Sequence, residues 1–394
     1  MSSRQNPIKI IFVIYKLTAD GSSIALLNLL DGLADKEISP MIIMSKKGSL
    51  CPELEKRSIP YLLIPYYLSR YYKFSNSFAN ILLFVPLLCY LQILNVIATM
   101  RIAKVAKRFN ADIIHTNIGP LQIGYNAAKK TGIKHVWHIR EYQGGIFSMK
   151  PFPSLTKFKE KLHSSYSIAI SKGIYNYYSL SENAKVIYDG VLKSTQTQFQ
   201  LNKKKYFLFV GQLQESKGIE QLIDGYIEFA IHNSDYELFL AGWGKESYVS
   251  KLKTKINDTG NRERTHFLGP RRDVFNLMSS ASAVIVSSLS EGFGFVAAEA
   301  MFNGCLVIGY NATGTKEQID NGLERHNKDI ALKYSNHEEL VTAMQDVAKN
   351  GVEYYFPMIM RAQETAFSLY SQERHASEVY NFYIEILSKT DNRK

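Results

Sequence analysis

Residues 287–305 of the chain read SSLSEGFGFVAAEAMFNGC, from Ser287 to Cys305. The β-branched apolar run Ala283–Val286 precedes them and predicts a buried strand. Two glycines then interrupt the chain, and a helix is predicted from Phe295 to a stop at Asn303-Gly304. A strand, a glycine turn and a helix are the arrangement by which α/β proteins direct backbone N–H groups and a positive helix end at an anion. The stretch therefore predicts an α/β fold with an anion site.

Two glutamates distinguish this stretch from an ordinary phosphate-binding turn. Glu291 lies on the loop, and Glu299 follows in the second turn of the predicted helix. Carboxylates repel phosphate, so we expect them to accept hydrogen bonds from neutral hydroxyls on either side of it. At about 1.5 Å per helical residue, the pair brackets a ligand roughly one nucleotide-sugar long. The alternative is a surface turn with two solvated glutamates.

This pattern resembles the family 4 glycosyltransferases, whose mark is E-x7-E. Glu291 and Glu299 fill the acidic positions, and the surrounding EGFG and EAM runs match as well. The resemblance implies a GT-B fold, in which two Rossmann-like domains with parallel sheets face each other across a cleft. It implies transfer of a sugar from a nucleotide diphosphate sugar to a glycan or lipid-linked acceptor, with retention of anomeric configuration. The run HIRE, residues 138–141, is similar to a subgroup that acts in bacterial surface-polysaccharide assembly, such as capsule or O-antigen synthesis.

The domain organisation is predicted from length and from the order of strands. A chain of 394 residues suits two α/β domains. We expect an acceptor-binding domain over residues 1–195, a polar linker over 196–205 and a nucleotide-sugar-binding domain over 206–370. By resemblance, a C-terminal helix over 371–394 packs back on the first domain.

The composition predicts a cytoplasmic globular protein. Cys51, Cys89 and Cys305 have no metal or redox spacing, and the opening apolar run is too short for a signal peptide. No acidic pair or His/Asp cluster in the sequence indicates a metal site. We therefore expect no cofactor and no metal, with a nucleotide diphosphate sugar as the donor substrate.

The charge is unevenly divided along the chain. Residues 1–195 carry 25 Lys and Arg against 11 Asp and Glu, whereas residues 196–394 carry 22 against 25. An excess of positive charge in the first half of the chain indicates binding to nucleic acid or to an anionic membrane surface. Because no helix-turn-helix, zinc or RNP-type motif is present, we predict no nucleic-acid partner. We expect the protein to be a peripheral membrane protein on the inner face of the cytoplasmic membrane.

The stretch from Phe74 to Met100 contains no charged residue. Three interpretations stay open: helices that lie in a lipid interface, ordinary core helices, and a membrane span. Its length permits a span, but Pro86 interrupts it and it lies between strands of one domain. The basic residues on both flanks favour the interface.

Two histidines follow predicted strands of the first domain, where ligands collect in parallel sheets. His138 corresponds to the family's histidine that faces the donor sugar, and His115 is the alternative. Alternatively, either histidine is a structural residue whose ring nitrogens form hydrogen bonds with neighbouring groups. The resemblance thus gives His138 and Glu291 as the catalytic residues, with Glu291 holding sugar hydroxyls.

The resemblance also implies the donor-binding residues of the second domain. Lys217 matches the family's diphosphate loop G-R-x-x-x-x-K-G, but Gln212 stands at the arginine position, so Arg271 or Arg272 would supply the missing charge. The other expected donor contacts are the backbone of Gly294, Phe295 and Val296 for the leaving phosphate, Glu299 for the ribose, Gly242 and Trp243 near the base, and Gly21 in the first loop. For the loop at Gly21, capping of the next helix by Ser22 or Ser23 is the alternative interpretation.

Two rival functions remain open. One is another GT-B activity, such as a nucleotide-sugar epimerase, which the EGFGF context disfavours. The other is a non-catalytic sugar-nucleotide-binding or scaffold subunit of a membrane assembly, which Gln212 motivates.

Overall fold

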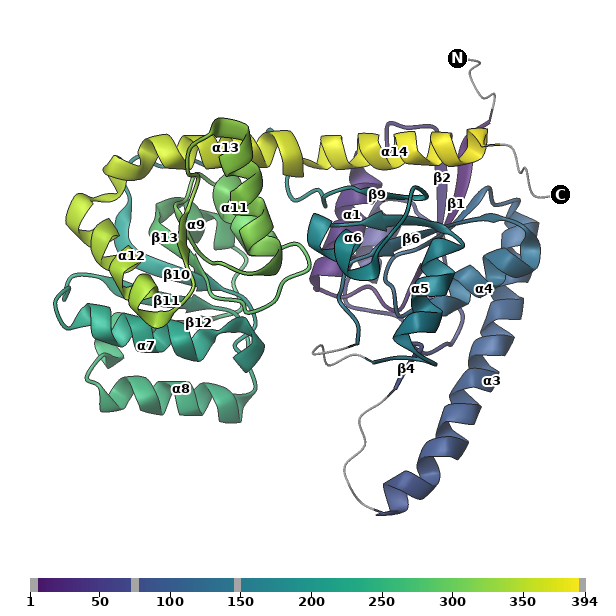
Figure 1. Cartoon of the computed structure of the whole chain (residues 1–394), viewed down its shortest axis with the longest axis horizontal. Helices are drawn as coiled ribbons and strands as arrows, with labels where there is room; N and C mark the ends of the chain where they lie inside the picture. Colours follow the sequence, from purple (N-terminus) through teal and green to yellow (C-terminus); the bar gives the residue numbers. More distant parts are fainter. Residues whose placement is uncertain (1–5, 72–77, 145–149, 390–394) are drawn as a thin grey trace. The chain divides into compact units, whose positions relative to one another are not determined.

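The strand-forming runs assemble into two parallel sheets in a computed structural model (Figure 1). The structure describes residues 6–71, 78–144 and 150–389, and the side chains of 78–85 are left out of the description. Contacts divide the chain into two compact units, residues 1–189 with 375–394 and residues 190–374. The two parallel-sheet α/β units confirm the predicted fold class.

The first unit has a seven-stranded sheet in the order β3-β2-β1-β5-β6-β8-β9. Its strands are β1 Ile8–Ile14, β2 Ile38–Met44, β3 Tyr61–Leu63, β5 Ile113–Thr116, β6 Lys134–Ile139, β8 Tyr166–Ala169 and β9 Ala184–Val186. Its helices are α1 Gly21–Gly32, α2 Cys51–Lys56, α3 Phe78–Phe109, α4 Gln122–Thr131, α5 Leu155–His163 and α6 Lys172–Tyr178, and the short strands β4 Arg70–Tyr71 and β7 Lys150–Pro151 form a separate antiparallel pair. Strand β1 is apolar except at Lys9, because helices cover both faces of a parallel sheet.

The second unit has a six-stranded sheet in the order β12-β11-β10-β13-β14-β15. Its strands are β10 Lys204–Val210, β11 Glu237–Ala241, β12 Thr265–Gly269, β13 Ala281–Val286, β14 Val307–Tyr310 and β15 Leu332–Tyr334. Its helices are α7 Ile219–Ala230, α8 Glu246–Asp258, α9 Val274–Ser280, α10 Phe295–Phe302, α11 Thr313–His326, α12 His337–Asn350 and α13 Phe356–Tyr370. Strand β10 lies between β11 and β13, so the strand order reverses there, and the carboxyl ends of the strands on either side of such a point form a ligand crevice.

The unit boundaries differ from the sequence-based boundaries at residues 195 and 370. The polar segment before β10 belongs to the second unit, where Lys203 Nζ donates to the carbonyls of Ser279 at 2.6 Å and Gly304 at 2.7 Å. Because these bonds tie the segment to α9 and to the end of α10, residues 196–205 do not form a free linker in this structure.

The helix-favouring run at the C-terminus is divided in two. Helix α13 ends at Tyr370, Ser371 is extended, and α14 Gln372–Ser388 begins immediately after it. From residue 375 onward the chain belongs to the first unit. There α14 buries Ala376, Val379, Phe382, Tyr383 and Ile386 in the core that also contains β1.

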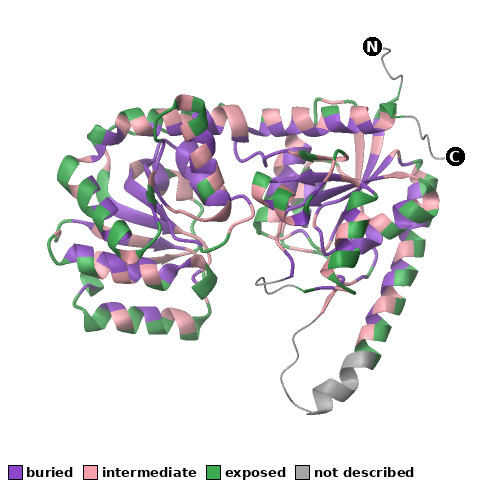
Figure 2. Ribbon diagram, in the orientation of Figure 1, coloured by how far each residue is buried: buried purple, intermediate pink, exposed green. Residues whose placement is uncertain are grey.

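Helix α3 is one helix of 32 residues rather than several short ones. Its inner face packs in the core beside α4, and its outer face is exposed (Figure 2). The exposed apolar side chains, which we name the α3 row, are Tyr90, Ile93, Val96, Ile97 and Met100, with exposed fractions of 42 to 59%. Length and composition alone would let residues 86–109 cross a membrane, a test that core helices of soluble proteins also pass.

Candidate functional site

Most of the predicted donor residues lie at the carboxyl edge of the second unit's sheet. The loops that follow β10, β11, β12 and β13 all emerge at this edge because the strands are parallel. These loops contain Lys217, Gly242, Arg271 and Glu291 in that order. The fold therefore brings together residues that are far apart in sequence.

Lys217 and Glu291 form the centre of the candidate site. Lys217 Nζ lies 2.6 Å from Glu291 Oε1, and the two side chains are 27% and 21% exposed. The Ser287 hydroxyl donates to the Lys217 carbonyl at 2.8 Å, which seats the lysine loop on the end of β13. Gly218 has φ +64°, and a Cβ there would lie 2.0 Å from the Ser287 carbonyl oxygen. A glycine is thus required at the matched K-G position for this close approach.

The loop that carries Glu291 is held by α11. Glu291 N–H donates to Thr313 Oγ1 at 2.8 Å, and Gly314 N–H donates back to the Glu291 carbonyl at 3.1 Å. Gln318 Nε2 donates to the carbonyls of Phe293 at 2.7 Å and Gly294 at 3.1 Å. These supports cannot be read from the sequence, because they join the start of α11 to a loop that lies 22 residues earlier in the chain.

Gly294 is the N-cap of α10 and has φ +95°, a conformation that favours glycine. No side chain caps this helix. The N–H groups of Phe295 and Val296 belong to its first turn and therefore have no acceptor within the helix. The predicted anion-binding backbone thus lies at the positive end of α10, in the same segment as Glu291.

Glu299 lies in the second turn of α10 and is half-buried. Burial raises the pKa of its carboxyl group to about 7. Within the described part of the chain, no hydrogen bond to this carboxylate is found. The group is therefore available to a ligand and titrates near neutrality.

Gly242 and Trp243 lie beside the lysine loop. Gly242 has φ +153°, and a Cβ there would lie 1.7 Å from the Gly211 carbonyl oxygen. The Trp243 carbonyl accepts from Leu213 N–H at 2.8 Å, and its side chain is 57% exposed. An exposed indole next to an anion site offers a flat surface on which a base can stack.

The structure does not place Arg271 as a substitute for the arginine missing at Gln212. Arg271 is exposed on the loop after the edge strand β12 and forms a bidentate pair with Asp273, at 2.8 and 2.7 Å. Because Asp273 already balances its charge, Arg271 is not a free cation for a diphosphate in this arrangement.

In the first unit, Gly21 is the exposed first residue of α1. The alternative interpretation, capping by Ser22 or Ser23, is wrong: Asp20 is the N-cap, and its Oδ1 accepts from Ser23 N–H at 3.0 Å. Asp20 is the N-cap because its carboxylate reaches the free N–H groups of the first turn. A pocket of about 160 Å³ lies here, lined in part by Lys16, Asp20, Ser22 and Asn117.

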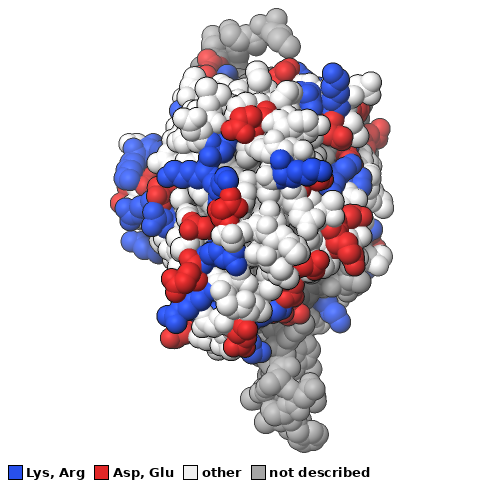
Figure 3. Space-filling model, turned by 90° about the vertical axis from the view of Figure 1, so that its left-hand side faces the viewer, with Lys and Arg blue, Asp and Glu red and all other residues white. Residues whose placement is uncertain are grey.

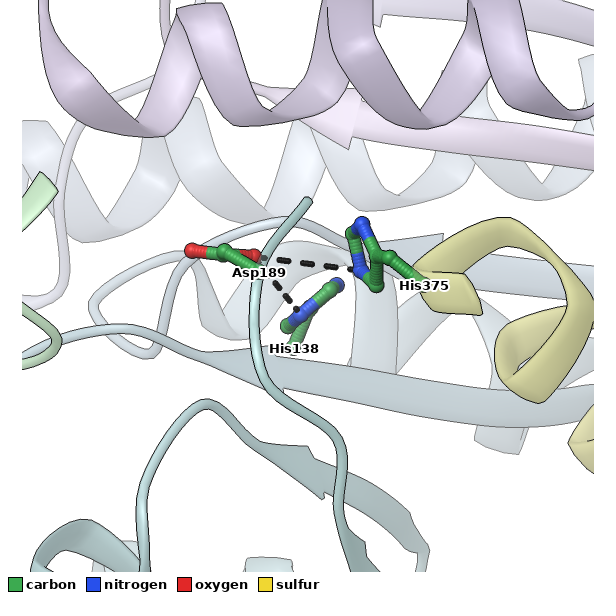
Figure 4. Close-up of side chains that lie close together, drawn as sticks. All are labelled: His138, Asp189 and His375. Atoms are coloured by element: carbon green, nitrogen blue, oxygen red, sulfur yellow. Dashed lines mark ion pairs between the residues drawn. The ribbon is translucent and has the colours of Figure 1, made fainter. Parts of the chain in front are cut away.

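His138 is fully buried in a polar cluster of the first unit (Figure 4). Its Nε2 lies 3.7 Å from Asp189 Oδ1, and His375 Nε2 of α14 lies 3.8 Å from the same oxygen. Arg140 pairs with the other oxygen of Asp189. Burial and then the charge of Arg140 lower the pKa of His138 well below 6.5, so the imidazole is neutral. His138 has no exposed surface in this structure, and its contact with a donor sugar stays a prediction.

His138, Asp189 and His375 also have the composition of a metal site, with ligand atoms within 4.8 Å of one another. Arg140 Nη2 donates to His138 Nδ1 at 3.3 Å, which fixes the proton of the neutral ring on Nε2. That proton faces Asp189, where a metal ion would require a bare nitrogen. Within the described residues, Asp189 is hydrogen-bonded through Oδ2 to Arg140, whereas its Oδ1 lies beyond hydrogen-bond distance of His138 Nε2. His115, the alternative histidine, is buried beside His138 and bonded to Tyr383 at 2.8 Å.

Comparison with known proteins places this geometry in context. Residues 193–365 match the family model described as glycosyl transferases group 1. An uncharacterized glycosyltransferase of Methanocaldococcus jannaschii is 32% identical over 49% of this chain and 55% of its own length. The O-antigen chain mannosyltransferase RfbU of Salmonella typhimurium is 30% identical over 43% of this chain and 47% of its own length. The chain thus spans about half the length of these curated relatives.

Among solved structures, Anabaena HepE in complex with UDP and glucose superposes with a TM-score of 0.75 at 18% identity, over 95% of this chain and 98% of that chain. The fold is therefore that of the GT-B proteins.

Proposed function

We propose that this chain is a retaining GT-B glycosyltransferase that moves a hexose-type sugar from a nucleotide diphosphate sugar to a glycan or lipid-linked acceptor. The observation that carries the proposal is the Lys217–Glu291 pair in the same site as the uncapped start of α10. The match of residues 193–365 to group 1 glycosyl transferases supports it, because that segment contains the pair. A role in surface-polysaccharide synthesis, such as capsule or O-antigen, rests on the likeness to RfbU.

We assign a role to each site residue from the charge of its side chain or backbone groups. When a diphosphate arrives, Lys217 exchanges its bond to Glu291 for phosphate oxygens, and Glu291 is released to accept from sugar hydroxyls. The N–H groups of Gly294–Val296 stabilise the charge that develops on the leaving phosphate, which is the main catalytic contribution of such a site. Glu299 accepts from the ribose, and Trp243, with Gly242, lies at the base. For His138, which is buried in this structure, contact with the donor sugar is the role that the resemblance predicts.

A transfer assay tests the proposal. The purified chain is incubated with a panel of nucleotide sugars and lipid-linked acceptors, and the products are identified by mass spectrometry. We expect free nucleotide to be released only when an acceptor is present. Nucleotide-sugar binding without release under any combination would instead support the non-catalytic subunit that Gln212 suggests.

The pKa of Glu299 predicts a pH-dependent donor affinity. The ionised carboxylate is the form that accepts from ribose hydroxyls, so UDP-glucose should bind more weakly as the pH falls through about 7. Between pH 8 and pH 6 the ionised fraction falls from roughly nine tenths to one tenth, which limits the loss to about tenfold. Calorimetric titration of the protein with UDP-glucose at both values measures it.

Glu299→Gln should remove this pH dependence and weaken binding at pH 8 by about 1–3 kcal/mol. Glu338→Gln makes the same charge change on the exposed face of α12 and should preserve the wild-type profile. An unchanged pH profile in Glu299→Gln would show that the assignment of Glu299 to the ribose is wrong.

We further propose that the first unit docks on the anionic inner face of the cytoplasmic membrane. The α3 row continues along the helix into Arg101, Lys104, Lys107 and Arg108, so apolar and basic side chains share its exposed side. This pairing is typical of interfacial helices. The face of the second unit drawn in Figure 3 shows acidic and basic residues interspersed, as its small net charge predicts.

A further inference from the structure

A second pocket of the first unit lies along the flank of the α3 row. Its volume is about 100 Å³, and its polar lining consists chiefly of Ser69, Gln92, Asn95, Gln122, Asn126 and Lys161. Val96 belongs both to this lining and to the α3 row. Residues three and four apart are neighbours on a helix, so the pocket opens next to the exposed apolar side chains.

The amide walls of this pocket are fixed by hydrogen bonds. Gln122 is 4% exposed, and its Nε2 donates to the Phe152 carbonyl at 2.8 Å. Asn95 is 5% exposed and bonds both the N–H and the carbonyl of Tyr67, at 2.9 and 3.2 Å. These side chains hold their positions before any ligand arrives, so the site is preorganised.

Lys161 supplies a cation that no carboxylate balances within the described residues. Its Nζ donates to Gln122 Oε1 at 2.5 Å, which directs the ammonium group into the pocket lining. Burial, and next the charge of Lys129, lower its pKa. A partly buried cation beside a second cation favours an anion at this place.

We propose that this pocket binds the phosphate headgroup of a lipid whose acyl chains contact the α3 row. The inference rests on the proposed membrane docking and adds a specific subsite to it. An apolar row and an unbalanced cation, joined at Val96, match a ligand with a phosphate at one end and hydrocarbon at the other. Lys161 and the amide donors would hold the phosphate oxygens, as charge-assisted hydrogen bonds do.

Vesicle sedimentation tests the subsite. Vesicles of phosphatidylcholine carry either phosphatidic acid, with an exposed phosphate, or phosphatidylserine, at matched surface charge. We expect the wild-type chain to bind the phosphatidic acid vesicles more tightly, and Lys161→Gln to lose that preference, by about fivefold for one lysine. Glutamine can still donate to Gln122 Oε1, and an unchanged circular dichroism melting curve checks the fold.

Two controls separate the subsite from the docking. Lys157→Gln removes one charge from an exposed residue of the same helix, α5, and should keep the preference. Ile93→Ser in the α3 row should weaken binding to both kinds of vesicle alike.

Three results would overturn the proposal. The first is equal binding of both vesicles by the wild-type chain, and the second is a preference that persists in Lys161→Gln. The third is displacement by millimolar glycerol phosphate, which would make the pocket a site for soluble phosphates. Failure to bind any vesicle would overturn the membrane docking as well, but it would leave the transfer assay untouched.

Discussion

Replacing Lys217 with alanine should reduce sugar transfer by about 10²–10³-fold, the usual effect of removing one donor that stabilises transition-state charge. The reason is positional. Gln212 brings no charge, so Lys217 is the side-chain cation of the loop that follows β10. The loss should appear mainly in kcat, because the charge on the leaving phosphate develops in the transition state. Nucleotide release with a saturating donor and acceptor measures it.

The matched control is Lys205→Ala. Lys205 also belongs to the second unit and pairs with an acid, Asp235, but it lies on β10 and is exposed. We expect transfer by this variant to equal that of the wild-type chain. If Lys217→Ala retained wild-type kcat, the assignment of Lys217 to the diphosphate would be wrong.

Replacing Asp189 with alanine should destabilise the first unit by about 3–5 kcal/mol, because it leaves a buried charge without its partner. Arg140 would lose its carboxylate, and the imidazoles of His138 and His375 would lose the oxygen they face. The chain has two tryptophans, and Trp137 lies buried in the first unit on β6, the strand that also carries His138. Urea unfolding followed by Trp137 fluorescence, in a Trp243→Phe background, therefore reports on that unit.

Glu160→Ala is the matched comparison, since it removes one member of an exposed pair in the same unit and should leave the unfolding midpoint where it was. Equal midpoints for Asp189→Ala and Glu160→Ala would show that the buried cluster does not stabilise the first unit.

The amino-acid sequence carries the information for the sheets and for the centre of the site. Strands β1 and β13 are apolar runs interrupted only by Lys9 and Ser282, which a parallel sheet covered on both faces buries. The stretch from Ala281 to Cys305 forms the predicted strand, glycine turn and helix. Local sequence decides these features, because backbone conformation at glycines and helix starts depends on near neighbours.

The environment of each side chain was decided by the tertiary structure. His138 lies at the end of a predicted strand, where a site residue is expected. In the structure it is buried beside Asp189 and His375, which are distant from it along the chain. The α11 contacts that hold the Glu291 loop likewise join segments with no shared local pattern. Burial, pairing and pKa depend on which distant segments meet, and packing of the whole unit, rather than local propensity, selects those neighbours.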